Sequence, residues 1–232
     1  MENQSLTEKK EIFENESFFT KNLQRRSFLQ YAGASAAGIA LVAAGCKKNK
    51  NDNGAVYFGS GDIGILNYAY ALEQLEAAFY IKVIGSQYSG ITAAEVSLLT
   101  DIRDHEIAHR EFFKAAIGSN AIPNLEVDFT SIDFGSRASV LGTAKAFEDL
   151  GVSAYNGAGA LLKSSTYLTL AGKIVSVEAR HAALIRDLLS NGTFSDDLDS
   201  DAKDISKLPP EVLDIASKYI KTKLNVIDLP TS

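Results

Sequence analysis

The chain has 232 residues, of which 46% are hydrophobic and 22% are charged, so it is long enough for one well-buried domain with an appendage. Its formal net charge is −6, and because it carries no stripe of basic residues, we expect no nucleic-acid partner. Cys46 is the single cysteine, which excludes a disulfide within the chain and a zinc site built from cysteines.

The N-terminal segment is typical of an export address. Arg25 and Arg26 precede Ser-Phe-Leu and then a run of small and apolar residues over 31–45, which resembles a twin-arginine signal. That run is shorter than the ~20 apolar residues of a membrane-spanning helix. We therefore expect export by the twin-arginine route to the cell envelope or periplasm. The alternative is a chance arginine pair before an apolar helix.

The apolar run ends at Cys46, in a sequence that resembles a bacterial lipobox except that Ala43 stands where leucine is usual. This predicts an export signal over residues 1–46 and a lipid on Cys46 that anchors the protein to a membrane. The polar residues that follow predict a flexible tether over 47–60. The alternative is a free cysteine beside a simple cleavage site.

The rest of the chain carries apolar residues at helical spacing. We predict four long helices and a shorter fifth, over residues 61–84, 92–117, 137–163, 167–189 and from 209 to near 224. Asp62 is a plausible N-cap, Thr92 and Glu95 have the spacing of a capping box, and Gly85 is a plausible stop. Residues 193–232 are expected to form an acidic, solvated loop and the C-terminal helix.

The lengths of the connections predict the topology. Short loops join the first helix to the second and the third to the fourth, so each of these pairs is expected to be an antiparallel hairpin. Residues 118–136 form a long crossover between the two hairpins. The sequence therefore predicts an all-α four-helix bundle over residues 61–192, with a short additional helix at the C-terminal end.

The most informative motif occurs twice. Glu106 and His109 form one Glu-x-x-His, and Glu178 and His181 form another, although the chain has only three histidines. Positions i and i+3 lie about 60° apart around a helix, so each pair points a carboxylate and an imidazole in one direction. Such a pair, supplied by two helices, matches the ligands of a metal site.

The other two predicted helices offer one more carboxylate each. The third helix offers Glu148, and the first offers either Glu73 or Glu76. Tyr155 follows Glu148 by seven residues and Tyr80 follows Glu73 by seven, which favours Glu73 and a pseudo-twofold repeat. Glu76 stays open as a solvated carboxylate or an alternative ligand. We interpret both tyrosines as core residues, or as groups that touch the ligands and assist catalysis.

With these motifs the chain resembles the ferritin-like superfamily of dinuclear metal proteins, and in particular the exported bacterial ferritin-like domain proteins of the desiccation-related type. The resemblance covers about residues 60–192 and implies a ferritin-like bundle that binds two metal ions. It implies that Glu73 and Glu148 are terminal carboxylate ligands and that Glu106 and Glu178 bridge the two ions. His109 and His181 would each supply the imidazole of one ion.

The resemblance implies iron as the most fitting metal, with manganese as the alternative, because both accept carboxylate and imidazole ligands. The expected activity is oxidation of Fe(II) by O₂ or peroxide in envelope stress protection. A manganese catalase-like enzyme and a non-enzymatic stress or surface protein are the alternatives, and a homodimer is plausible. His105 is expected at the surface or beside the ligands, and the partners of Arg180 and Arg186 stay open.

Overall fold

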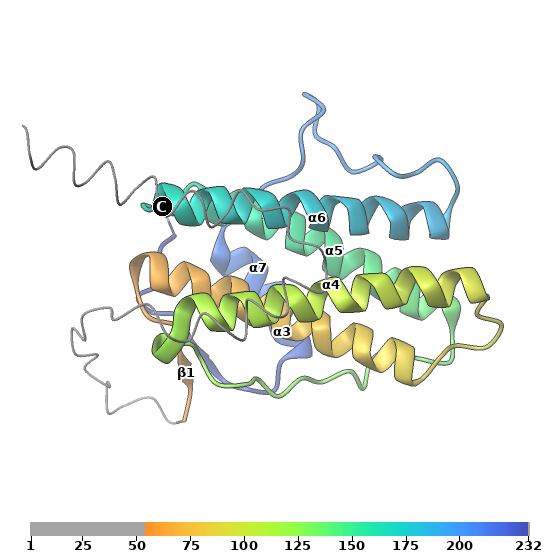
Figure 1. Cartoon of the computed structure of the whole chain (residues 1–232), viewed down its shortest axis with the longest axis horizontal. Coiled ribbons are helices and arrows are strands. Elements are labelled where there is room, and N and C mark those ends of the chain that lie inside the picture. Colours follow the sequence, from red (N-terminus) through yellow and green to blue (C-terminus); the bar gives the residue numbers. More distant parts are fainter. Residues whose placement is uncertain (1–53, 232) are drawn as a thin grey trace, which may run out of the picture. The chain divides into compact units, whose positions relative to one another are not determined.

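The computed structural model describes residues 54–231, so Arg25, Arg26 and Cys46 lie outside the described residues. Within this range the chain folds mainly as helices (Figure 1). The elements in chain order are β1 (Val56–Tyr57), α3 (Gly61–Gly85), α4 (Ala93–Ile117), η2 (Gly118–Asn120), α5 (Arg137–Gly159), α6 (Ser165–Leu189), α7 (Pro209–Ala216), η3 (Ser217–Tyr219) and β2 (Leu224–Asn225). None of the helices between residues 54 and 231 has the length and hydropathy needed to cross a membrane.

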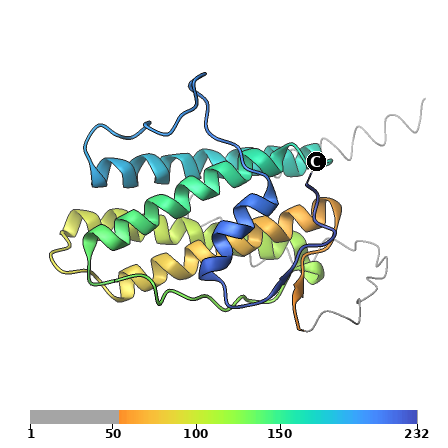
Figure 2. The same ribbon diagram turned by 180° about the vertical axis from the view of Figure 1, so that it is seen from behind.

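The four long helices form two hairpins that lie side by side. Helix α3 packs mainly on α4, and α5 packs mainly on α6 (Figure 1). The crossover runs along the bundle from the end of α4 to the start of α5, and α7 packs on α5 (Figure 2). The predicted fold, an all-α four-helix bundle with a short C-terminal helix, is therefore confirmed.

Two of the predicted helix limits change. Helix α5 ends at Gly159 rather than near 163, and α7 ends at Ala216 rather than near 224. At the start of α4, the capping box is present, because the Thr92 side chain accepts a hydrogen bond from the Glu95 amide and Glu95 accepts from the Thr92 amide. This box positions the first turn of the helix that carries the first Glu-x-x-His.

Asp62 does not cap its own helix. The N-cap of α3 is Ser60, which makes no capping hydrogen bond with its side chain. Instead the Asp62 carboxylate accepts from the backbone amides of Lys163 and Ser164, at 2.8 and 2.9 Å. The prediction of an N-cap was therefore wrong, because the carboxylate satisfies amides of the α5–α6 loop and joins the two hairpins at that end.

Helix α3 is buried almost all round, and two amide side chains satisfy the backbone groups packed against it. Asn67 donates to the carbonyls of Phe58 and Asn120, both at 3.0 Å, and accepts from the Ile122 amide at 2.9 Å. Gln74 accepts from the Leu125 amide at 2.8 Å. These bonds hold the start of the crossover against α3, because a buried backbone group without a partner is costly.

The last part of the expected tether over 47–60 is folded. Val56 and Tyr57 pair in parallel with Leu224 and Asn225, and Phe58 is completely buried. The crossover also contacts the C-terminal segment, through an isolated antiparallel bridge between Val127 and Ile220. Both contacts join residues that are distant in sequence, so local patterning could not reveal them.

Candidate metal centre

The structure brings all six predicted ligand residues together in the middle of the bundle. The four carboxylates have no exposed surface, and the two histidines are 9% and 4% exposed. Each of the four long helices contributes, α3 with Glu73, α4 with Glu106 and His109, α5 with Glu148, and α6 with Glu178 and His181.

The contacts around the two imidazoles repeat with pseudo-twofold symmetry. His109 Nδ1 lies 2.8 Å from Glu178 Oε1 and 3.4 Å from Glu73 Oε2. His181 Nδ1 lies 2.8 Å from Glu106 Oε1 and 3.4 Å from Glu148 Oε2. Each imidazole thus approaches one terminal carboxylate and the carboxylate of the opposite Glu-x-x-His.

The donor atoms form two overlapping groups, and within each group they lie within 4.8 Å of one another. One group consists of Glu73, Glu106, His109 and Glu178, and the other consists of Glu106, Glu148, Glu178 and His181. Glu106 and Glu178 belong to both groups, so they are the two carboxylates that the groups share.

The two tyrosines of the repeat contact the terminal carboxylates across the bundle. The Tyr155 hydroxyl donates to Glu73 Oε1, and the Tyr80 hydroxyl donates to Glu148 Oε1. In both carboxylates the other oxygen faces the cluster. Each hydroxyl therefore fixes the orientation of a carboxylate and leaves one oxygen available, as a group that supports a metal ligand does.

His105, which the sequence left open, lies beside His181. The two rings are stacked, and His105 Nδ1 lies 3.0 Å from His181 Nε2. With Nε2 engaged by this contact, Nδ1 is the nitrogen of His181 that faces the carboxylates. A hydrogen bond of this kind selects the tautomer of a ligating histidine.

Glu76 is not solvated, which removes one of its two interpretations. It is 3% exposed, and its Oε2 atom is buried without a hydrogen-bond partner. It takes part in neither group of converging donor atoms. Its pseudo-twofold counterpart is Gly151, and a Cβ atom there would come within 3.0 Å of Glu76 Oε1. Glycine at this position thus makes room for a fifth carboxylate beside the cluster.

Arg186 is buried and forms ion pairs with Asp149 and Asp197. Asp149 follows the terminal carboxylate Glu148 in α5, so this cluster ties α6 and the acidic segment to that part of α5. The sequence predicted a solvated acidic loop, but Asp197 of this loop is paired with the buried Arg186, so the loop is only partly solvated. Arg180 stays on its own helix, where it donates to Ser176.

Burial and the imidazoles control the protons in the metal-free cluster. Burial raises the pKa of Glu73 to about 7, and burial followed by the charge of Glu106 raises the pKa of Glu178 well above its ordinary value. Burial disfavours the charged form of Glu106 too, but the close contacts and charges of both imidazoles hold its pKa below the ordinary value. Without metal, protons therefore reduce the negative charge of the cluster.

The two imidazoles hold some of these protons. Burial alone would lower the pKa of His181, but the charge of Glu148 and the contact with Glu106 raise it to about 11. The same balance raises the pKa of His109 well above its ordinary value, with Glu73 as the main carboxylate. A metal ion has to displace these protons before the ring nitrogens can ligate it.

The donor set fits metal ions better than it fits hydrogen bonding within the cluster. Both Nδ1 atoms and the oxygens of Glu106 and Glu178 are buried and lack hydrogen-bond partners in the described residues, although several lie within 3 Å of one another. These donor atoms thus lie close together without well-directed hydrogen bonds between them. Such an arrangement is costly without cations, because buried carboxylates need compensation.

The comparison with known families agrees with this geometry. Residues 61–191 match the family model of the ferritin-like domain. The chain therefore belongs to the ferritin-like domain family, and the matched range contains all four long helices and all six converging residues. No protein of curated function matches the chain.

Proposed function

We propose that the protein is an exported, lipid-anchored ferritin-like protein whose centre holds two metal ions, preferably iron, and supports oxidation of Fe(II) by O₂ or peroxide. The observation that carries this proposal is the sharing of Glu106 and Glu178 by two groups of donors. One group of four donors would serve a single ion, whereas two groups with common carboxylates suit an adjacent pair.

Charge and ligand number support a redox-active pair. Glu73, Glu106, Glu148 and Glu178 carry four negative charges when ionised, which two divalent ions neutralise. Six side chains are few for two ions that accept up to six ligands each, so positions stay open for an oxidant. When bound, the metal pair supplies two electrons, one from each ion.

The reaction balances with either oxidant. Two Fe(II) ions, as substrate, each release one electron, and O₂ accepts both with two protons to give hydrogen peroxide. Alternatively, hydrogen peroxide accepts the two electrons and two protons to give two water molecules. In this proposal Tyr80 and Tyr155 hold the terminal carboxylates, His105 fixes the tautomer of His181, and the apolar residues of the bundle exclude bulk water.

Manganese is the second candidate, because the oxygen and nitrogen donors accept it equally well. A manganese pair would support disproportionation of hydrogen peroxide, as in a catalase. A scaffold that keeps the bundle without turnover is the remaining candidate. In all three cases the protein would act in the cell envelope, where its function would be protection against oxidative stress.

Metal analysis and an oxidation assay decide among these functions. The protein purified from its own host should contain close to two iron or manganese ions per chain. Fe(II) oxidation followed by absorbance should be fast for the wild type and lost in Glu106→Ala, with Glu111→Gln, a change at the surface of the same helix, as the control. Equal rates in wild type and Glu106→Ala would remove this chemistry.

The anchor needs a separate experiment, because it depends on Cys46, Arg25 and Arg26 rather than on the bundle. Replacement Cys46→Ser should release the protein from membranes in its host, and Arg25→Lys with Arg26→Lys should block export. A protein with Cys46→Ser that stays on the membrane would remove the lipid from the proposal.

A further inference from the structure

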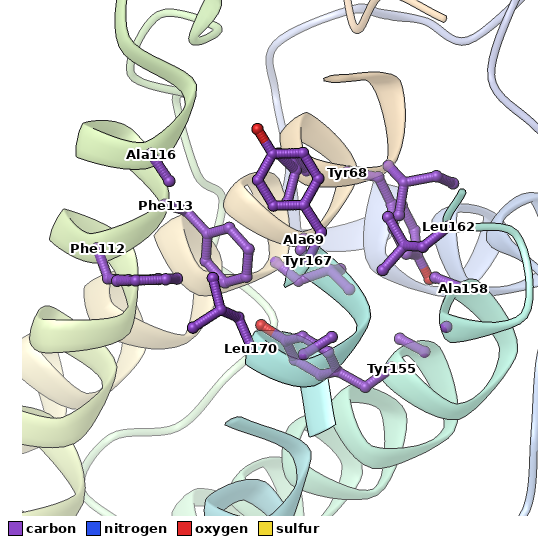
Figure 3. Close-up of a pocket in the computed structure, with 16 residues that line it drawn as sticks. Tyr68, Ala69, Phe112, Phe113, Ala116, Tyr155, Ala158, Leu162, Tyr167 and Leu170 are labelled. Atoms are coloured by element: carbon purple, nitrogen blue, oxygen red, sulfur yellow. The ribbon is translucent and has the colours of Figure 1, made fainter. Parts of the chain in front are cut away.

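An apolar pocket lies between the four long helices at the end of the bundle where α5 ends and α6 begins (Figure 3). The space open to the centre of a water-sized sphere is about 20 Å³. Among the lining residues only Tyr68, Tyr155 and Tyr167 carry a polar side-chain atom, and the others are aliphatic, phenylalanine or glycine residues. Tyr167, Leu170 and Ala171 are only partly buried, so the pocket approaches the surface along α6.

The inner wall of the pocket is one hydrogen bond away from the candidate centre. Tyr155 lines the pocket, and its hydroxyl donates to Glu73. Phe113 lines it from α4, one helical turn after His109, and its ring centroid lies 6.3 Å from that of Tyr155. A molecule in the pocket would therefore contact Tyr155, whose hydroxyl holds Glu73, and Leu72, which precedes Glu73 in α3.

The other end of the bundle shows that such a space is not required by the fold. Leu72 and Ala154 line the pocket. By the offset that relates Glu73 to Glu148, Leu72 corresponds to Phe147, and Ala154 corresponds to Phe79. Phe79 and Phe147 pack edge to face at 5.1 Å, and Phe79 also packs on Tyr80 at 5.1 Å. Smaller side chains beside Tyr155 thus leave a space that phenylalanines fill beside Tyr80.

We propose that this pocket is a binding site for a small apolar gas, which holds O₂ beside the centre. The space exceeds the roughly 10–15 Å³ that one water molecule needs, but the only polar side-chain atoms in its lining are three tyrosine hydroxyls, and that of Tyr155 already donates to Glu73. Water and hydrogen peroxide would therefore exchange most of their hydrogen bonds for apolar contacts. O₂ has no such bonds to lose, so the pocket selects it. The use of this gas as the oxidant rests on the proposed function.

Xenon tests the site without any metal. Crystals of the metal-free protein under xenon pressure should show one xenon atom between Leu72, Phe113 and Tyr155. Leu72→Phe, which installs the residue present at the equivalent position, should abolish it, and Ala158→Val is a milder variant that should weaken it. Leu189→Phe, at an exposed position of α6, is the matched control. No xenon in the wild type, or an unchanged site in Leu72→Phe, overturns the proposal.

Oxidation kinetics test whether O₂ uses the site. In the iron-loaded protein, Leu72→Phe should raise the KM for O₂ severalfold and lower the ratio of the O₂-driven to the peroxide-driven rate, whereas Leu189→Phe should change neither. Loss of the xenon site with an unchanged KM for O₂ overturns the role of the pocket. If the wild type binds xenon but oxidises no Fe(II), the proposed function fails while the gas site stands.

Discussion

The bridging position of Glu106 allows a quantitative test of metal binding. Glu106 belongs to both groups of donor atoms, so Glu106→Gln should weaken both metal positions at once. Glutamine keeps the size of the side chain but removes the charge and one strong ligand oxygen. Glu111→Gln is the control, because this residue lies on the same helix with its side chain 38% exposed and paired with Arg110.

The expected magnitude follows from linkage. A metal ion present at 100 times its Kd stabilises the fold by about 2.7 kcal/mol, so two ions give about 5 kcal/mol. For a domain of this size each kcal/mol corresponds to about 2–4 °C in Tm, so the wild type should gain about 10–20 °C. If the variant binds about 100-fold more weakly, each site contributes only about 0.4 kcal/mol and the gain is about 2–3 °C.

Differential scanning calorimetry measures these gains directly. Each protein is scanned with EDTA and again with Mn²⁺, which avoids iron oxidation during heating. The compared quantity is the metal-induced rise in Tm, so a direct effect of the substitution on the metal-free fold cancels. The reasoning is refuted if Glu106→Gln gains as much as the wild type, because the ions then bind elsewhere, or if the wild type gains nothing with Mn²⁺ or Fe(II).

Three further predictions concern protons, tyrosines and backbone packing. The pKa of His181 is raised from 6.5 to about 11, so its protonation stabilises the folded state. This contribution to the free energy of unfolding is full below pH 6.5 and is lost as the pH rises toward 11. Urea unfolding of the metal-free protein should therefore give a free energy of unfolding that falls between pH 7 and 10, while the affinity for Mn²⁺ rises. A free energy of unfolding that rises over this range contradicts the prediction. Tyr155→Phe should lower metal affinity about 10–100-fold in a titration, and Tyr70→Phe, a buried tyrosine outside the cluster, should not; equal affinities would remove the role of that hydroxyl. At Gly157 a Cβ atom would lie 1.8 Å from a backbone oxygen of the C-terminal segment, so Gly157→Ala should unfold the protein or detach that segment. A Cβ atom added at Gly142 would meet no atom within 4 Å beyond its own helical turn, so Gly142→Ala should stabilise the protein by about 0.5–1 kcal/mol in thermal unfolding. Equal effects at both glycines would contradict the packing argument.

Much of the bundle could be predicted from the sequence, because its determinants are local. The capping box at Thr92 marks the start of α4, and the length of the 118–136 segment marks the crossover. The Glu-x-x-His spacing fixes a direction on each helix, and the resemblance to the ferritin-like superfamily implied that Glu106, His109, Glu178 and His181 converge, as they do. Whether these residues ligate metal stays a proposal.

The features that escaped prediction depend on contacts between distant segments. Phe58 lies within the expected tether over 47–60 but is buried, because its neighbours in β1 pair with residues 224–225. Asp62 has the spacing of an N-cap, but the amides that it accepts from belong to residues 163 and 164. The burial of Glu76 has one signal in the sequence. The equivalent position in the second hairpin is Gly151, which has no side chain to compete with the Glu76 carboxylate for space.

The central claim is that two metal ions share this centre, and anomalous X-ray diffraction from crystals loaded anaerobically with Fe(II) tests it most directly. The account predicts two iron peaks about 3.5–4 Å apart, the separation of dinuclear centres. One ion should contact His109 Nδ1 and Glu73, the other should contact His181 Nδ1 and Glu148, and both should contact Glu106 and Glu178. A single peak within the cluster, or iron bound only outside it, would contradict the account.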